Sequence, residues 1–326
     1  MKNKKVVVIG GGHGLSTILR GIKFIDNIDI TAIVTVADDG GSTGRLRKQF
    51  HIPAMGDIRN VLISMAQSES LLSSLMDYRF ESNHDPDKED EDVQGHNLGN
   101  LILTALTQTC GGFMEAITTC GEILNVKGKI MPSTLQVVTL YAMMEDGTIV
   151  KGEANIPNFN NRIQKVFYNE PVSATAGAIS AIKEADLIIY GIGSLYTSIL
   201  PNVIIKDIQE ALNASKALKV YFCNVMSQPG ETDGYSVEDH VLALKMHKVS
   251  VDKVVVADDI IPAYIIERYE KEGSSIVKVV EDKHNYEICY YNLLDFANNV
   301  VRHDCMKVKD VVSKIVEEDL CHFQQR

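Results

Sequence analysis

Apolar segments that end in glycine-rich or polar turns recur five times along this sequence, and they constrain its fold more than any other feature. The segments are Lys5–Ile9, Ile30–Val36, Leu187–Tyr190, Val220–Cys223 and Val254–Ala257. Short apolar runs bounded by turn residues are typical of strands buried on both faces of a parallel sheet. Ligands of such sheets bind beyond the carboxyl ends of the strands, where the loops meet. The sequence therefore predicts a polar ligand crevice built from several loops.

Helical and strand-like segments alternate through most of the chain. Helices are expected after the first turn to about Ile25 and over residues 57–67, 71–80, 98–109, 175–185, 204–214, 236–247, 262–272 and 308–318. This alternation predicts an α/β fold, a Rossmann-like doubly wound, mostly parallel sheet flanked by helices. Residues 126–170 show no helical pattern and carry an Asp146-Gly147 turn signal, so a small β-rich hairpin insertion is expected there. We expect residues 1–326 to form a single domain of this kind.

Charge and composition exclude several classes of function. The net charge of −11 disfavours a nucleic-acid partner, which requires a basic face. Asp85–Asp92 holds six acids and one lysine, so we expect a mobile acidic loop over residues 82–94. No apolar run reaches the length of a signal peptide or a membrane span, and no cysteine pair has metal-site spacing. We therefore expect a cytoplasmic protein without membrane insertion.

The first loop, Gly10–Ser16, is similar to a dinucleotide-binding fingerprint. Gly10 and Gly12 have the spacing of its first two glycines, but Leu15 occupies the position of the third. The helix that follows presents free N–H groups at its start, and these form an anion site. We expect Gly11, Gly12 and His13 to hold a phosphate, and NAD is one dinucleotide that such a loop accepts.

The second loop begins with paired acids. Asp38 or Asp39 lies where a Rossmann protein binds a ribose hydroxyl, and the same pair can hold Mg²⁺ against a diphosphate. Gly40–Gly44 is a flexible run that brings amides and the Ser42 hydroxyl to a ligand.

Two further motifs combine helix starts with hydrogen-bond donors. Asp57 is a suitable N-cap, while Arg59 and Asn60 directly behind it are suited to binding phosphate or carboxylate. Asn100 belongs to the cluster His96–Asn100, for which helix capping by Asn97 is an equally good interpretation. Ser194, Thr197 and Asn224 follow later strands and complete the predicted ligand-binding set.

These motifs together resemble the gluconeogenesis factor family. The matching segments are Gly10–Ser16, Ala37–Arg47, Gly56–Asn60, His96–Asn100, Met131–Thr134, Gly193–Asn202 and Cys223–Thr232, and Arg302-His303-Asp304 fits as well. The family is a branch of the superfamily that contains the 2-phospho-L-lactate transferases. The resemblance implies a cytoplasmic regulator that binds UDP-N-acetylglucosamine and is needed for cell shape and cell-wall synthesis on gluconeogenic carbon sources. It also implies a ligand-binding role for Arg302.

The transferase branch supplies the main alternative. A Mg²⁺-dependent transferase with a nucleoside-diphosphate donor would use Asp38, Asp39 and Asp57. However, Arg59 stands where those enzymes carry a second acid, and a fixed positive charge repels Mg²⁺. An NAD-dependent oxidoreductase is a weaker alternative, supported only by the glycine loop. Regulatory or cell-wall synthesis proteins are expected partners, and a homodimer is expected from base rates alone.

Overall fold

The computed structural model describes residues 3–67, 71–81, 93–159 and 161–320. Most of the acidic segment 82–94 lies outside these residues, so its predicted mobility stays a prediction. Within the described part of the chain, no helix has the length and apolar character needed to cross a membrane.

A seven-stranded parallel sheet forms the centre of the molecule and confirms the predicted α/β fold. Its order is β10-β9-β8-β7-β1-β2-β3. The strands are β1 Lys4–Gly10, β2 Ile28–Val34, β3 Lys129–Pro132, β7 Leu187–Tyr190, β8 Leu218–Phe222, β9 Lys253–Ala257 and β10 Glu287–Tyr291. The chain proceeds outward from β1 in one direction and from β7 in the other. The boundary between β1 and β7 is therefore the topological switch point, where open α/β sheets bind ligands.

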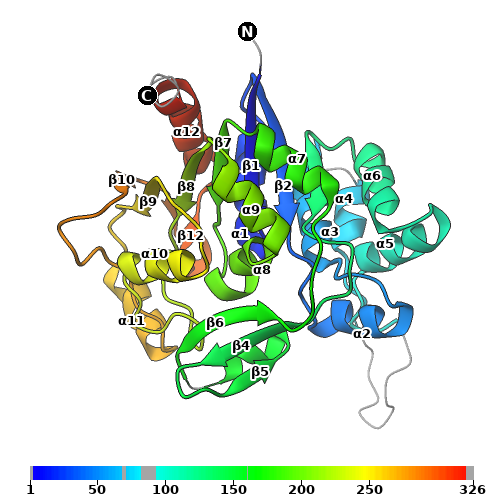
Figure 1. Cartoon of the computed structure of the whole chain (residues 1–326), viewed down its shortest axis with the longest axis horizontal. Helices are drawn as coiled ribbons and strands as arrows, with labels where there is room; N and C mark the ends of the chain where they lie inside the picture. The colour runs from blue at the N-terminus through cyan, green and yellow to red at the C-terminus, as the bar shows by residue number, and fades with distance from the viewer. Residues whose placement is uncertain (1–2, 68–70, 82–92, 160, 321–326) are drawn as a thin grey trace.

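Helices cover both faces of the sheet. Helix α1 (Gly12–Ile22) packs against α3 (Gly56–Met65) and α12 (Cys305–Lys314) on one face. Helices α7 (Ala176–Glu184) and α9 (Lys206–Ala214) pack together on the other, in front of the central strands in Figure 1. Helix α1 forms because Leu15, Ile18, Leu19 and Ile22 recur at helical spacing and are all fully buried.

The other helices lie mainly in the connections between strands. They are α2 Gly41–Phe50, α4 Leu71–Asp77, α5 Leu98–Thr109, α6 Phe113–Ile123, α8 Leu200–Val203, α10 Val237–Met246 and α11 Ala263–Lys271. Helix α2 corrects the sequence interpretation, because the glycine run expected to be a flexible loop begins a helix. Helix α6 and strand β10 were not expected from the sequence.

A small antiparallel sheet lies below the carboxyl ends of the central strands in Figure 1. Its strands are β4 Leu140–Met144, β5 Ile149–Lys151 and β6 Ile163–Tyr168, in the order β5-β4-β6. Gly147 makes the turn between β4 and β5 with a φ of 85°, as the Asp-Gly signal predicts. The insertion is narrower than residues 126–170, because β3 belongs to the central sheet. A final pair, β11 Leu294–Asp295 and β12 Arg302–His303, brings the C-terminal segment back towards the site.

Close packing between α1 and α12 depends on a glycine. A Cβ on Gly21 would lie 2.0 Å from the backbone oxygen of Cys305, at the start of α12. We expect Gly21→Ala to lower the free energy of unfolding by about 1–3 kcal/mol through overpacking. Gly121→Ala in α6 is the control, because its Cβ would lie 3.9 Å from Leu62 and Val126. That substitution should raise stability by about 0.5–1 kcal/mol. Urea unfolding measures both, and equal stability of Gly21→Ala and wild type would contradict the packing argument.

Candidate functional site

A cavity of about 400 Å³ opens at the switch point between β1 and β7. Its walls come from the loops after β1, β7 and β8, from α11 and from the C-terminal segment. The lining residues are Gly11, Gly12, His13, Gly14, Ile192, Gly193, Ser194, Ser198, Asn224, Val225, Met226, Gln228, Tyr269, Val301 and His303. Five of them, namely Gly11, Gly12, His13, Ser194 and Asn224, belong to the predicted ligand-binding set. Three of the five recurring strand–turn units therefore converge on one cavity.

Glycines allow the loops after β1 and β7 to approach each other. Helix α1 begins at Gly12, whose φ is +63°, so the N–H groups of its first turn lie at the cavity. A Cβ on Gly14 would lie 2.4 Å from the backbone oxygen of Ile192. The Asn202 amide then ties the loops together, because its Nδ2 donates to the Gly10 oxygen (3.1 Å) and the Ser198 oxygen (2.8 Å). This junction places a helix N-terminus against a ligand-sized cavity, an arrangement suited to anions.

The loop after β8 supplies polar side chains on the opposite wall. Asn224 Nδ2 donates to Gln228 Oε1 (3.3 Å), and Gln228 Nε2 donates to Ser194 Oγ (2.6 Å). This chain of three side chains joins the β8 loop to the β7 loop. Thr197, predicted as a ligand-binding residue, does not line the cavity, because its hydroxyl donates to the Glu231 carboxylate (3.1 Å).

Four carboxyl groups lie near one another beside the glycine loop, and none of them lines the switch-point cavity. Burial raises the pKa of Asp57 to about 7, and the charge of Asp38 adds to this rise. Burial likewise raises the pKa of Glu153 to about 8 and of Glu231 to about 7, and it raises the pKa of Asp38. The charges of the other three acids raise the pKa of Glu153 further. Glu153 and Glu231 were missed by sequence reasoning, since a single acid in a polar loop carries no pattern.

Asp57 is held by the glycine loop and does not cap its helix. Helix α3 begins at Gly56 with Met55 in the cap position, which corrects the predicted N-cap role. The Gly12 N–H donates to the Asp57 carboxylate, and a Cβ on Gly11 would lie 2.4 Å from Asp57 Oδ2. Asp57 therefore supports the loop that forms the cavity wall.

Asp38 and Asp39 do not act as a pair. Asp38 Oδ1 accepts from the Gly40 N–H (2.9 Å), whereas Asp39 Oδ1 accepts from the Ala154 N–H in the insertion (3.0 Å). Among the residues with described positions, no group of three or more His, Cys, Asp or Glu side chains is arranged to hold a metal ion. Mg²⁺ at Asp38 and Asp57 would therefore require phosphate oxygens from a ligand to complete its shell.

Arg59 and the residues predicted with it form a separate network. The Arg59 guanidinium donates to Asn60 Oδ1 (2.7 Å) and Asn100 Oδ1 (3.3 Å), and it pairs with Asp77 at 3.8 Å. Asn100 Nδ2 donates in turn to Ser42 Oγ (3.2 Å). None of these residues lines the switch-point cavity. The structure gives the network a structural role that joins α2, α3 and α5.

Arg302 and His303 differ in where they lie. Arg302 is exposed and does not line the cavity, whereas His303 does. Burial lowers the pKa of His303 to about 4, so its ring is neutral near pH 7. Gln228, Tyr269 and His303 line the cavity but were not in the predicted site. For His303 the only sequence signal was the Arg-His-Asp match to the family.

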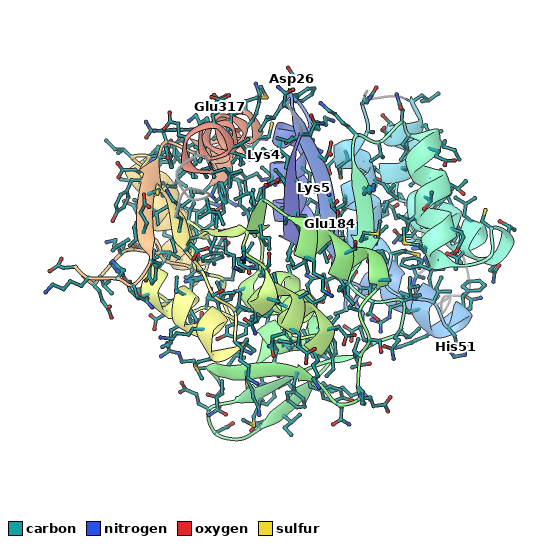
Figure 2. All side chains as sticks on the ribbon, turned by 45° about the horizontal axis from the view of Figure 1, so that its top comes forward. Lys4, Lys5, Asp26, His51, Glu184 and Glu317 are labelled. Carbon is teal, nitrogen blue, oxygen red and sulfur yellow. The ribbon has the colours of Figure 1, made fainter. Side chains whose placement is uncertain are left out.

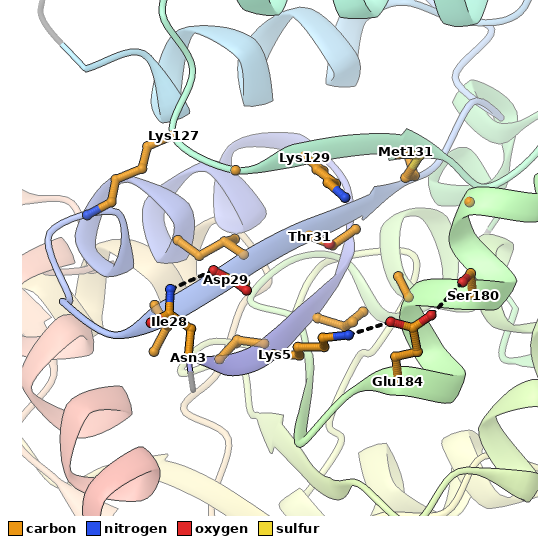
Figure 3. Close-up of a pocket in the computed structure, with 16 residues that line it drawn as sticks. Asn3, Lys5, Ile28, Asp29, Thr31, Lys127, Lys129, Met131, Ser180 and Glu184 are labelled. Atoms are coloured by element: carbon orange, nitrogen blue, oxygen red, sulfur yellow. Dashed lines mark hydrogen bonds and ion pairs between the residues drawn. The ribbon is translucent and has the colours of Figure 1, made fainter. Parts of the chain in front are cut away.

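A larger cavity of about 600 Å³ lies on the open face of β1, β2 and β3, beside α7 (Figure 3). Its charged and polar side chains are largely bonded to one another. Lys5 pairs with Glu184, Glu184 also accepts from Ser180 (3.0 Å), and Asn3 donates to Asp29 (2.8 Å). It contains none of the predicted ligand-binding residues. We therefore place the functional site at the switch point, although that cavity is smaller.

The raised pKa values of Asp57, Glu153 and Glu231 make the free energy of unfolding dependent on pH. An acid whose folded pKa exceeds its unfolded value loses stability as pH rises, because the unfolded chain releases its proton first. We expect the free energy of unfolding to fall between about pH 4 and pH 7 partly through Asp57. Asp57→Asn should make this fall shallower, as measured by urea unfolding across that range.

The control is Asp26→Asn, because Asp26 is exposed near Lys4 at the amino ends of the central strands (Figure 2). It should change the free energy of unfolding by no more than about 0.5 kcal/mol, as expected for an exposed side chain. A slope that stays equal in wild type and Asp57→Asn would show that Asp57 is ionised throughout.

Comparisons with known proteins show the family of the chain. The profile of the 2-phospho-L-lactate transferase family (CofD) matches residues 6–294. The chain is 44% identical over 320 residues to the gluconeogenesis factor of Bacillus subtilis, covering 96% of this chain and 98% of that protein. It is 42% identical over 318 residues to a putative gluconeogenesis factor of Thermotoga maritima, covering 95% and 99%.

A crystal structure of a Bacillus halodurans protein, described as a member of the upf0052 family, superposes with a TM-score of 0.88. It is 42% identical, and the match covers 96% of this chain and all of that one. Identity of this extent over nearly whole chains establishes kinship. The chain therefore belongs to the gluconeogenesis factor family, within the larger group described by the 2-phospho-L-lactate transferase profile.

Proposed function

We propose that the protein is a cytoplasmic regulator that binds a nucleotide sugar, UDP-N-acetylglucosamine, and links its supply to cell-wall synthesis and cell shape during gluconeogenic growth. The main support for this proposal is the switch-point cavity, where the first turn of α1 meets the Ser194–Ser198 turn. In this proposal the α1 amides and the hydroxyls of Ser194 and Ser198 bind the diphosphate. We further propose that a homodimer acts through regulatory or cell-wall synthesis proteins.

The acids beside the glycine loop are suited to sugar or ribose hydroxyls. A carboxylate accepts hydrogen bonds from hydroxyl groups, while a protonated carboxyl group also donates one. The raised pKa values of Asp57, Glu153 and Glu231 keep part of this cluster protonated near neutral pH. A neutral carboxyl group beside a diphosphate costs less repulsion than a charged one. The cluster therefore tolerates an anionic ligand nearby and offers its hydroxyls both donors and acceptors.

A Mg²⁺-dependent transferase is the second candidate, favoured by the proximity of Asp38 and Asp57 and by the family profile. Two observations weigh against it. Asp39, the third acid of that mechanism, is bonded to the insertion. Arg59, where a further acid would be needed, is bonded to Asn60, Asn100 and Asp77.

Calorimetric titration with UDP-N-acetylglucosamine tests the binding proposal, with NAD and GDP as comparison ligands. We expect micromolar binding of the sugar nucleotide in the absence of Mg²⁺. Ser198→Glu should abolish it, because a carboxylate would then face the diphosphate. Ser180→Glu is a matched control that places the same charge in the other cavity (Figure 3), and it should bind like wild type. Equal binding by Ser198→Glu and wild type, or none by wild type, would refute the proposal.

Ligand turnover separates the two candidate functions. We expect UDP-N-acetylglucosamine and GDP to be recovered unchanged after incubation with the protein and Mg²⁺, as followed by ³¹P NMR. Transfer or hydrolysis that disappears in Asp38→Asn and Asp57→Asn, while Asp26→Asn remains active, would instead establish the transferase.

A further inference from the structure

Two residues that line the switch-point cavity each carry a buried polar atom with no hydrogen-bond partner among the described residues. These atoms are Asn224 Oδ1 and His303 Nε2. Buried polar groups are normally paired, so each exception calls for an explanation. Within the described part of the chain, six other side chains carry such an atom, but none of them lines the cavity. The coincidence of two unsatisfied atoms in one cavity points to a ligand that completes both.

The residues that line the cavity are of two chemical kinds. Gly11–Gly14, Gly193 and the serines offer backbone amides and hydroxyls, which suit phosphate. Val225, Met226 and Val301 are apolar, and the hydroxyl of the lining residue Tyr269 accepts from the Val301 N–H (3.1 Å). His303 follows Val301 by two residues and belongs to the same segment. A nucleobase has apolar faces and a polar edge, so it matches an apolar wall with a few fixed polar groups.

The hydrogen bonds of Asn224 define what it offers. Its Nδ2 is engaged by Gln228, whose own amide is bound to Ser194, and this arrangement leaves Oδ1 as an acceptor. His303 offers a neutral ring, because burial keeps its pKa near 4. A neutral imidazole has one N–H donor and one acceptor, and it forms no ion pair with phosphate. Together the two residues present one acceptor and one donor, the complement of a base edge.

We propose that Asn224 and His303 read the base of the nucleotide, with Asn224 Oδ1 accepting a ring N–H and His303 Nε2 donating to the adjacent carbonyl. This inference rests on the proposed function and extends it by fixing the direction of the ligand. The base lies on the β8 and β12 side, the diphosphate lies at α1, and the sugar extends towards the acids. For uracil, the matching groups are N3–H and a neighbouring carbonyl oxygen.

A ligand–protein double-mutant cycle tests this assignment. UDP and N3-methyl-UDP are titrated into wild type, Asn224→Ala, His303→Ala and the control Met306→Ala, which changes an exposed residue outside the cavity. We expect methylation to weaken binding to wild type and to Met306→Ala by about 10- to 100-fold, as expected for a lost buried hydrogen bond. Asn224→Ala should bind UDP about 10- to 100-fold more weakly than wild type, and methylation of the ligand should then weaken binding little further. His303→Ala should also bind UDP more weakly, but methylation should still weaken its binding further.

Melting temperatures of the variants identify any that fail to fold. Asn224→Asp keeps an acceptor, so it should restore the sensitivity to methylation even if Asn224→Ala is unstable. An equal methylation effect in wild type and Asn224→Ala would overturn the assignment, as would wild-type affinity of His303→Ala for UDP. If wild type binds no uridine nucleotide at all, the proposed function itself fails. If wild type binds UDP but the substitutions of Asn224 and His303 do not have the expected effects, only the base assignment fails.

Discussion

The close contact between the loops after β1 and β7 is the constraint on which the site depends. Gly14 lies against the Ile192 carbonyl with no room for a side chain, and Asn202 hydrogen-bonds to both loops. The contact fixes the start of α1 at the topological switch point and places the N–H groups of its first turn, of which that of Gly12 donates to Asp57, beside the Ser194–Ser198 turn. The central sheet, with its helices on both faces, holds the two strands in register. A phosphate site that uses backbone amides needs this rigidity, because it has no long side chain to adjust.

Buried acids beside the glycine loop are the second feature of this region. Asp57 accepts from the Gly12 N–H, so the glycine loop and the acid cluster are parts of one structure. Burial raises the pKa values of Asp57, Glu153 and Glu231, and the charges of neighbouring acids raise those of Asp57 and Glu153 further. Proton uptake, ligand hydroxyls and a divalent cation would each relieve the same repulsion.

The central fold was predictable because its signals are local. Each buried strand is a short apolar run followed by a turn, and their recurrence defines a parallel sheet with its ligand end. Helix α2 was missed because its first residues are glycines and hydroxyl residues, and tertiary contacts such as Ser42 to His96 (2.9 Å) stabilise it. His303 was missed because it reaches the cavity from a distant segment, and Glu153 and Glu231 were missed because a single acid in a polar loop carries no pattern. Arg59 does not line the cavity, because partners in α4 and α5 direct its side chain, and sequence spacing does not show them.

A crystal structure of the protein with UDP-N-acetylglucosamine would show directly whether the ligand lies at the switch point. We expect diphosphate oxygens within hydrogen-bond distance of the N–H groups in the first turn of α1 and of the Ser194 and Ser198 hydroxyls. A ligand bound on the open face of β1–β3 beside α7 (Figure 3), or phosphates held by Arg59, would contradict this expectation.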